Sequence, residues 1–282
     1  MYFYSLPSIV SLCVAWARLV SSTQGSASTS AQQQHTHVAN NSEFLSRQTH
    51  FGYTGATGPL GWAGLSPNNS LCTSGSRQSP INLGSWTGSP TVNPQVLISD
   101  GYGDFENLGT TVEVAAVGQT HFGGKNYQLR QFHFHTPSEH RINEEYFPLE
   151  IHLVHQASDG ARLVLGAVFE IATNGATTPL VDTLARQIQQ IATPGSKTRV
   201  YGLTSHELIN IFQNHRLYEY YGSLTTPPCS EGITWLVAQT PLALDVGSYL
   251  AFKRVLKFNS RYTQNIPGKI NLARIAASQM AR

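Results

Sequence analysis

The chain has 282 residues, a length that allows one large domain or two small ones. Hydrophobic residues make up 40% and charged residues 12%, so we expect an ordered domain with a sizeable core and exclude a disordered chain. The formal net charge of +2, without any basic cluster, argues against nucleic acid or another polyanion as a partner.

The first twenty residues are mostly apolar and small residues follow them, a pattern typical of a secretory signal peptide. We assign residues 1–25 to this peptide, with an approximate cleavage site, and residues 26–43 to a flexible leader that exposes His35 and His37. Because the apolar run is interrupted and short for a membrane span, we expect a secreted, extracellular protein without a stable membrane anchor. An uncleaved hydrophobic anchor is the alternative.

Two sequence features agree with secretion. Asn40-Asn41-Ser42 and Asn68-Asn69-Ser70 are sequons that predict N-glycosylation at Asn40 and Asn68. Cys13 lies in the signal segment, so Cys72 and Cys229 are the cysteines of the mature chain. An even number of cysteines in an oxidising compartment favours one disulfide, and two buried free thiols are the alternative.

Residues 44–282 show no second change of composition and no internal repeat, so we assign them to one domain. Runs of β-forming residues predict strands at Thr111–Val117, Tyr127–His135, Glu150–Gln156, Arg162–Ile171 and Ile233–Ala238. Many strands with few helices indicate a mainly β fold with peripheral helices (α+β), built on one large sheet.

Three helices are expected. The first lies between two prolines and has helical spacing of Leu180, Leu184, Ile188 and Ile191. The second begins with a capping box of Thr204 and Glu207, and the third covers residues 248–256.

One strand carries two histidines in alternation, in the run Gln131-Phe132-His133-Phe134-His135. Side chains at i and i+2 of a strand share a face, so His133 and His135 point the same way as Gln131, and the two phenylalanines point into a core. Two imidazoles at this spacing can converge on one metal ion. A pair of hydrogen-bonded structural histidines is the alternative.

A catalytic zinc ion needs a third protein ligand and one open position for water. The next strand offers His152 and His155 on opposite faces, and periodicity alone does not say which one faces the metal. A metal-bound imidazole usually donates its other N–H to an oxygen acceptor. Glu150 precedes His152 by two residues, as Gln131 precedes His133, which favours His152 as a ligand and His155 as a structural residue.

Several motifs, in order and spacing between Tyr53 and Trp235, resemble the α-class carbonic anhydrases. They are Arg77–Asn82, Gln131–His135, Ser138–His140, Glu150–His155 and Ser223–Pro228. The Thr-Pro after His135 and the cysteine pair are similar to the secreted bacterial, plant and fungal members. The resemblance implies one twisted, mostly antiparallel sheet of about ten strands, with zinc at the bottom of a conical cavity.

The resemblance also implies an activity, the reversible hydration of carbon dioxide to bicarbonate and a proton by a carbonate dehydratase, which is a lyase. It assigns Zn²⁺ to His133, His135 and His152 and implies a disulfide between Cys72 and Cys229. Zinc lowers the pKa of its bound water to about 7, a shift for which carbonic anhydrase is itself the reference case.

Further roles follow from the same resemblance. Thr225 would accept a hydrogen bond from the zinc-bound hydroxide and donate its own proton to Glu139. Thr226 would contact bicarbonate, and Tyr53 would join a water network. Carbon dioxide would bind an apolar wall formed by Val154, Val164, Leu224, Ile233 and Trp235. Without the resemblance these apolar residues are ordinary core residues and Thr225 is a turn residue.

Two positions depart from the family pattern. Many members place a proton-shuttling histidine a few residues before a Val-Glu pair, where this chain has Leu108 or Gly109, neither of which titrates. We therefore expect proton export to be slow and turnover to be limited by buffer. Arg130 stands where several relatives have an apolar residue, and either steers bicarbonate or reaches solvent.

Two other functions compete with this interpretation. A catalytically silent binding module would lack a zinc histidine, whereas all three are present, together with Glu139 and Thr225. A zinc esterase of another type would carry a motif such as His-Glu-x-x-His, which the sequence lacks, and ester hydrolysis is expected only as a side reaction. We expect a monomer or a homodimer.

Overall fold

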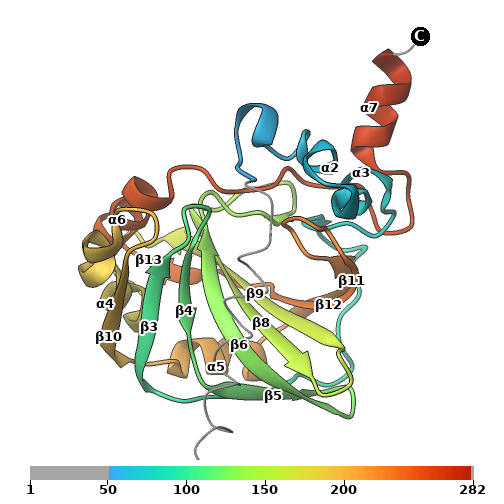
Figure 1. Ribbon diagram of the computed structural model, residues 1–282. Coiled ribbons are helices and arrows are strands. Elements are labelled where there is room, and N and C mark those ends of the chain that lie inside the picture. Colours follow the sequence, from blue (N-terminus) through green and yellow to red (C-terminus); the bar gives the residue numbers. More distant parts are fainter. Residues whose placement is uncertain (1–50, 281–282) are drawn as a thin grey trace, which may run out of the picture. The chain divides into compact units, whose positions relative to one another are not determined.

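The computed structural model describes residues 51–280, so the predicted signal peptide, the leader and Asn40 lie outside the described residues. One sheet of eleven strands dominates these residues (Figure 1). Its main path runs β10-β3-β4-β6-β8-β9-β12-β11, with β5 and then β2 extending from β6, and β13 beside β9. Neighbouring strands are antiparallel except where β9 meets β12 and β13. The predicted large, mostly antiparallel sheet is therefore confirmed.

The strands of the large sheet are β2 (Gln95–Ile98), β3 (Gly101–Asn107), β4 (Val112–Ala115), β5 (Gly118–Phe122), β6 (Lys125–His135), β8 (Leu149–Ala157), β9 (Arg162–Ile171), β10 (Lys197–Leu203), β11 (Leu217–Ser223), β12 (Glu231–Ala238) and β13 (Leu242–Leu244). A separate parallel pair joins β1 (Asn82–Leu83) to β7 (Arg141–Ile142). The α-helices of the described residues are α2 (Trp62–Leu65), α3 (Leu71–Ser74), α4 (Pro179–Gln187), α5 (His206–Asn214), α6 (Val246–Leu256) and α7 (Leu272–Met280).

The helix boundaries differ from the expectations at three places. The first expected helix is α-helical only to Gln187, and Ile188–Ile191 form a 3₁₀ helix. The predicted capping box is wrong, because α5 begins at His206 and its N-cap residue is Ser205, not Thr204. Ser205 donates its backbone N–H to Asp100 Oδ1 at 2.8 Å, so a carboxylate from a distant segment accepts the hydrogen bond. Helix α6 begins two residues earlier than predicted, since the Asp245 side chain accepts the N–H of Ser248 and caps it.

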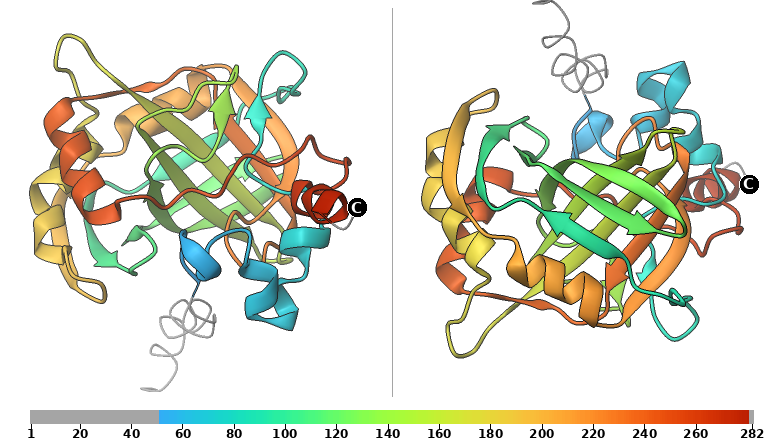
Figure 2. Two further views of the ribbon diagram at one scale, coloured as in Figure 1. Left: turned by 90° about the horizontal axis from the view of Figure 1, so that it is seen from above. Right: turned by 90° about the horizontal axis from the view of Figure 1, so that it is seen from below.

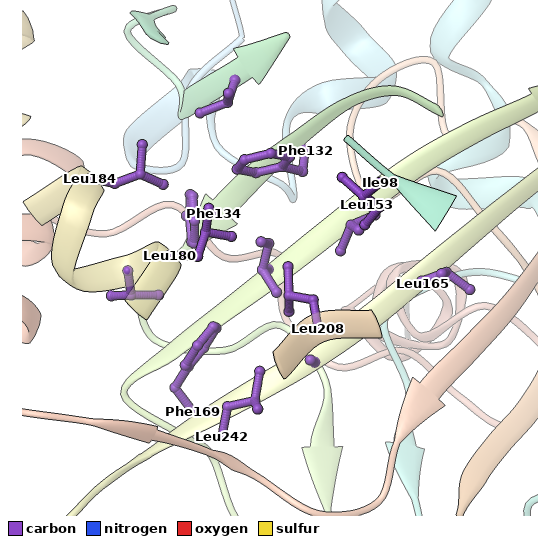
Figure 3. Packing of buried hydrophobic residues seen from close by; sticks show 14 of the residues in the cluster. Ile98, Phe132, Phe134, Leu153, Leu165, Phe169, Leu180, Leu184, Leu208 and Leu242 are labelled. Atoms are coloured by element: carbon purple, nitrogen blue, oxygen red, sulfur yellow. The ribbon is translucent and has the colours of Figure 1, made fainter. Parts of the chain in front are cut away.

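The two faces of the sheet have different coverings. Helices α4, α5 and α6 contribute apolar residues to a large core on one face, together with Phe132 and Phe134 of β6 (Figure 3). Figure 2 shows these helices and the segment with α2, α3 and α7 at separate places around the sheet. A smaller cluster that includes Val164 and Trp235 lies on the other face. We call this second face the site face, because the histidines discussed below lie on it.

A disulfide joins Cys72 of α3 to Cys229, with the two Cα atoms 5.1 Å apart, as the resemblance implies. Both cysteines pack in a third apolar cluster around the fully buried Trp62. Asn68 of the second sequon is exposed in the short helix Pro67–Asn69. Within residues 51–280, no helix is long and apolar enough to cross a bilayer.

Candidate metal centre

Three imidazoles meet on the site face. His133 and His135 come from β6, and His152 lies directly opposite His133 in the antiparallel register with β8. The ring centroids are 4.6 to 5.3 Å apart, and one nitrogen from each ring lies within 4.8 Å of the others. His155 lies on the opposite face, where it pairs in register with the core residue Leu129. The structure thus brings together the three histidines favoured by the sequence and separates the fourth from them.

Each of the two histidines of β6 donates a hydrogen bond from one ring nitrogen to an oxygen acceptor. His133 Nδ1 donates to Gln131 Oε1 at 2.8 Å, and His135 Nδ1 donates to the backbone oxygen of Asn259 at 2.7 Å. The Nε2 atom of His135 is buried and has no hydrogen-bond partner among the described residues. Such a nitrogen is costly to bury unless something binds its lone pair, so this donor set fits a metal ion.

The third histidine is held by a buried carboxylate network. Glu150 Oε1 accepts from His152 Nε2 at 2.7 Å and from His140 Nδ1 at 2.6 Å, while its Oε2 accepts the backbone N–H groups of Glu139 and His140. His140 Nε2 in turn lies 2.7 Å from the Tyr220 hydroxyl. A second geometric grouping of His140, Glu150 and His152 could also hold a metal, but its atoms are already engaged with one another. The three-histidine set is therefore the better metal centre.

Burial keeps all three imidazoles neutral. It lowers the pKa of His135 to about 4 and that of His152 below the usual range, against the opposing effect of the Glu150 carboxylate. It lowers the pKa of His133 well below the usual range, and the two neighbouring imidazoles add to this effect. Neutral imidazole is the form that ligates metals, so the centre is ready to bind an ion at neutral pH.

A carboxyl group lies beside the histidines. Burial raises the pKa of Glu139 to about 7, although His152, the Thr225 side chain and the backbone N–H of Arg261 act in the opposite direction. That N–H donates to Glu139 Oε1 at 2.8 Å, and Glu139 Oε2 lies 3.9 Å from His152 Nδ1. Burial, and next the Glu139 charge, raise the pKa of the Tyr53 phenol well above its usual range.

A second carboxyl group on the site face belongs to Glu113, which pairs in register with His133. Burial raises the pKa of Glu113 to about 7, and the neighbouring charge of Glu106 adds to this increase while Lys197 opposes it. In the sequence, Glu113 stands out only as the second residue of the Val-Glu pair. Its position beside a histidine becomes visible only once the strands are paired.

An apolar surface adjoins the three histidines. The five residues predicted to form the apolar wall all belong to or pack against the small cluster of the site face: Val154, Val164, Leu224, Ile233 and Trp235. The Trp235 ring lies 4.8 Å from the His152 ring, and its indole N–H donates to the Ser223 oxygen at 3.0 Å. Thr225 is buried in the loop after β11, and the neighbouring Thr226 is half-buried.

The segment that lacks a shuttle histidine forms a turn. Leu108 donates its backbone N–H to the Thr111 oxygen at 2.9 Å, and Gly109 has a φ of 79°. A side chain at Gly109 would be strained by this positive φ, and its Cβ would lie 3.4 Å from Pro194. Leu108 is therefore the position of the two that can carry a larger side chain.

Two further residues of the site have no recognisable signal in the sequence. Asn259, which accepts the hydrogen bond of His135, lies 124 residues further along the chain. Arg261 is buried, donates to the Ser79 and Cys72 backbone oxygens, and connects the disulfide region to Glu139. No local sequence pattern identifies either residue. Arginine is rarely fully buried, so the sequence offered no reason to expect Arg261 in the core.

The fold and the site together define a class of protein: a mainly β protein with a three-histidine centre of the kind that leaves one position of a catalytic metal open. The family model for eukaryotic-type carbonic anhydrase matches residues 57–272, and the chain belongs to this family.

Individual proteins agree with this assignment. The carbonic anhydrase of Pectobacterium atrosepticum is 36% identical over 228 residues, which cover 80% of this chain and 91% of that protein. The structure of the Aspergillus oryzae α carbonic anhydrase has a TM-score of 0.78 and 40% identity, over 81% of this chain and 99% of the other. A Thermovibrio ammonificans α carbonic anhydrase in complex with the inhibitor sulfanilamide has a TM-score of 0.71 and 33% identity, over 77% and 96%.

Proposed function

We propose that this protein is a secreted enzyme that uses Zn²⁺ to hydrate carbon dioxide reversibly to bicarbonate and a proton. The observation that carries the proposal is the convergence of three neutral imidazoles, each held by an oxygen acceptor through its other nitrogen. His133, His135 and His152 would hold the ion. When bound there, the ion lowers the pKa of water to about 7 and so supplies a nucleophile at neutral pH.

Thr225 and Glu139 orient that nucleophile. The hydroxyl of Thr225 has one hydrogen to donate, and the Glu139 carboxylate would be its acceptor. Thr225 then offers only lone pairs to the reacting oxygen, which must donate its own hydrogen and leaves a lone pair free for the carbon atom. A dication held by the histidines would favour the ionised form of Glu139, since opposite charges lower a carboxyl pKa.

The apolar wall receives carbon dioxide, which has no charge and makes only weak hydrogen bonds. Val154, Val164 and Trp235 lie in one row across the paired strands, beside the row that holds His133 and His152. An uncharged substrate bound on this row is therefore next to the metal centre. Thr226, adjacent to the orienting Thr225, would contact the bicarbonate product.

Turnover also requires export of a proton to solvent. Leu108 occupies the position that fits the family's shuttle histidine, and its aliphatic side chain cannot carry a proton. We therefore expect buffer to accept the proton, which makes steady-state turnover depend on buffer concentration.

The setting proposed for this activity is extracellular. The disulfide between Cys72 and Cys229 is compatible with an oxidising compartment. Asn68 is exposed and thus accessible to a glycosyltransferase. The proposed partners are carbon dioxide and bicarbonate, and the proposed assembly is a monomer or a homodimer.

The decisive experiment is a carbon dioxide hydration assay on the secreted protein, with the zinc content of the same sample measured. We expect one zinc ion per chain, loss of activity after chelation and recovery after zinc is returned. A folded protein with bound zinc but no hydration would instead indicate a catalytically silent binding module.

A further inference from the structure

Strand β6 contains a bulge close to the metal centre. The register with β8 shifts between Leu129 and Gln131, so Arg130 is an extra residue without a partner of its own. Leu129 and Phe132 both lie in the large core, which leaves Arg130 and Gln131 together on the other side of the strand. Gln131 accepts the hydrogen bond of His133, so this other side is the site face. The bulge thus places an exposed arginine beside a partner of a metal-binding histidine.

A second arginine lies on the site face two strands away. Arg162 of β9 follows the same alternation as Val164, which packs in the small cluster of the site face, whereas Leu163 and Leu165 lie in the large core. The two arginines flank β8, on strands separated by roughly 10 Å, and extended arginine side chains can span such a gap. Arg130 is three residues from His133, or about 10 Å along the strand.

Two acidic groups of this end of the sheet have partners other than Arg130. Asp159, in the turn between β8 and β9, pairs with Lys125 at 2.6 Å. Glu231 of β12 accepts from the side chain of Gln78 at 3.1 Å. The Arg130 side chain makes no ion pair or hydrogen bond with another residue in the range 51–280. Its positive charge therefore faces the outer end of the site without a partner among these residues.

We propose that Arg130 and Arg162 form an anion subsite that holds a carboxylate or bicarbonate group at the outer end of the site face. A guanidinium group presents two parallel N–H donors, which match the planar oxygens of both anions. A ligand that reaches the metal centre from solvent passes along this face. If the end of the ligand far from the metal carries a negative charge, that charge lies next to Arg130 and Arg162. The subsite rests on the proposed function, because it serves ligands of the metal centre.

A matched pair of aryl sulfonamides tests this subsite. The probes are 4-sulfamoylbenzoate and the uncharged 4-sulfamoylbenzamide, and the readout is the ratio of their dissociation constants at low ionic strength. We expect the preference for the carboxylate to be about two- to fivefold greater in the unaltered protein than in Arg130→Gln, as for an exposed ion pair. It should shrink at about 0.5 M ionic strength because salt screens the charges.

Control variants separate this effect from overall charge. Arg130→Lys should retain part of the preference, and Arg162→Gln should reduce it. Lys125→Gln removes an exposed cation from the same strand whose partner is Asp159, and should leave the ratio unchanged. An equal ratio in the unaltered protein and in Arg130→Gln would overturn the proposal. If Arg130→Gln does not fold, a ratio that is independent of ionic strength in the unaltered protein overturns it.

The same proteins distinguish failure of the subsite from failure of the metal centre. If the uncharged probe does not bind the zinc-loaded protein, the proposed function fails. If it binds and the carboxylate probe gains nothing from Arg130, only the subsite fails. Competition of bicarbonate against the uncharged probe then identifies the ligand: weaker competition in Arg130→Gln indicates bicarbonate, and unchanged competition together with a lost carboxylate preference indicates an organic carboxylate.

Discussion

Strand β8 presents two buried histidines on its two faces, and they are used differently. Burial lowers the pKa of both His152 and His155, to about 4 in the case of His155, so both rings are neutral near pH 7. His155 Nδ1 donates to the Leu153 oxygen at 2.9 Å, and its Nε2 accepts from the Thr120 hydroxyl at 3.0 Å. His152 donates a hydrogen bond from Nε2 to Glu150 Oε1. Its other ring nitrogen, Nδ1, is directed toward the imidazoles of His133 and His135.

This difference shows that neither burial nor a lowered pKa makes a histidine a metal ligand. The two residues differ in two respects. His152 keeps one ring nitrogen without a hydrogen-bond partner in the described part of the chain, and this nitrogen lies near the ring nitrogens of His133 and His135 on β6. His155 has no lone pair left to give, because both of its nitrogens are satisfied. The predictions below test this contrast between the two faces of the sheet.

The largest contrast is expected between two alanine variants. His152→Ala should lose stoichiometric zinc and all zinc-dependent hydration, since it removes a ligand. His155→Ala should keep one zinc ion per chain but lose about 1–3 kcal/mol of stability, because the buried Thr120 hydroxyl loses its partner. Metal analysis and urea unfolding measure both effects. Full zinc occupancy in folded His152→Ala would contradict the assignment.

The orienting pair should affect the rate without affecting the metal. Thr225→Ala is expected to lower the turnover number by about 10²–10³, the cost of removing a group that positions reacting atoms, with zinc content unchanged. Thr178→Ala removes a buried hydroxyl that bonds the Ala243 oxygen and serves as a matched control. A turnover number of Thr225→Ala close to that of the control would exclude the proposed role.

The oxygen partners of the two histidines should differ in their effect on zinc affinity. Gln131→Ala and Glu150→Gln should weaken zinc binding about 10–100-fold, as is usual for partners of metal ligands. Thr120→Ala, which removes the partner of His155, should leave zinc affinity unchanged. Competition with a chelator of known affinity gives the three dissociation constants. Equal weakening in all three variants would remove the distinction between the faces.

His155 should contribute to acid sensitivity. Its pKa is about 4 in the folded protein and about 6.5 when unfolded, so the unfolded state binds more protons between these values and stability falls as pH falls. Between pH 7 and pH 5 we expect a loss of about 2 kcal/mol from this residue. Urea unfolding of His155→Gln at both pH values should show a smaller loss than the unaltered protein. An identical loss would show that His155 is already exposed to protons in the folded state.

The smallest expected effect concerns proton export from the site face. Leu108→His places a titratable group in the turn before β4 and should raise turnover at low buffer by roughly three- to tenfold, with little change at high buffer. Leu108→Asn is a polar control that does not titrate near neutral pH. If turnover is already high and independent of buffer, or if both variants gain equally, another group exports the proton.

Much of the site face could be predicted from local patterns. The alternation in β6 placed His133 and His135 on one face and the phenylalanines in the core, and the structure agrees. The long apolar strands β8 and β9 were predicted within about two residues, since few other structures suit such runs. Strands β3 and β10 were missed because their glycines and charged residues weaken the alternation at the edge of the sheet.

The sequence by itself determined which residues of a regular strand segment share a face, because that depends only on the two-residue repeat of the backbone. It also supplied a preference for His152 over His155 through the nearby Glu150. Only the tertiary structure decided which groups meet on that face. Asn259 reaches His135 from 124 residues away, and Arg130 shares a face with Gln131 only because the register of β6 shifts between them. Such contacts depend on strand pairing between distant segments, which no local pattern encodes.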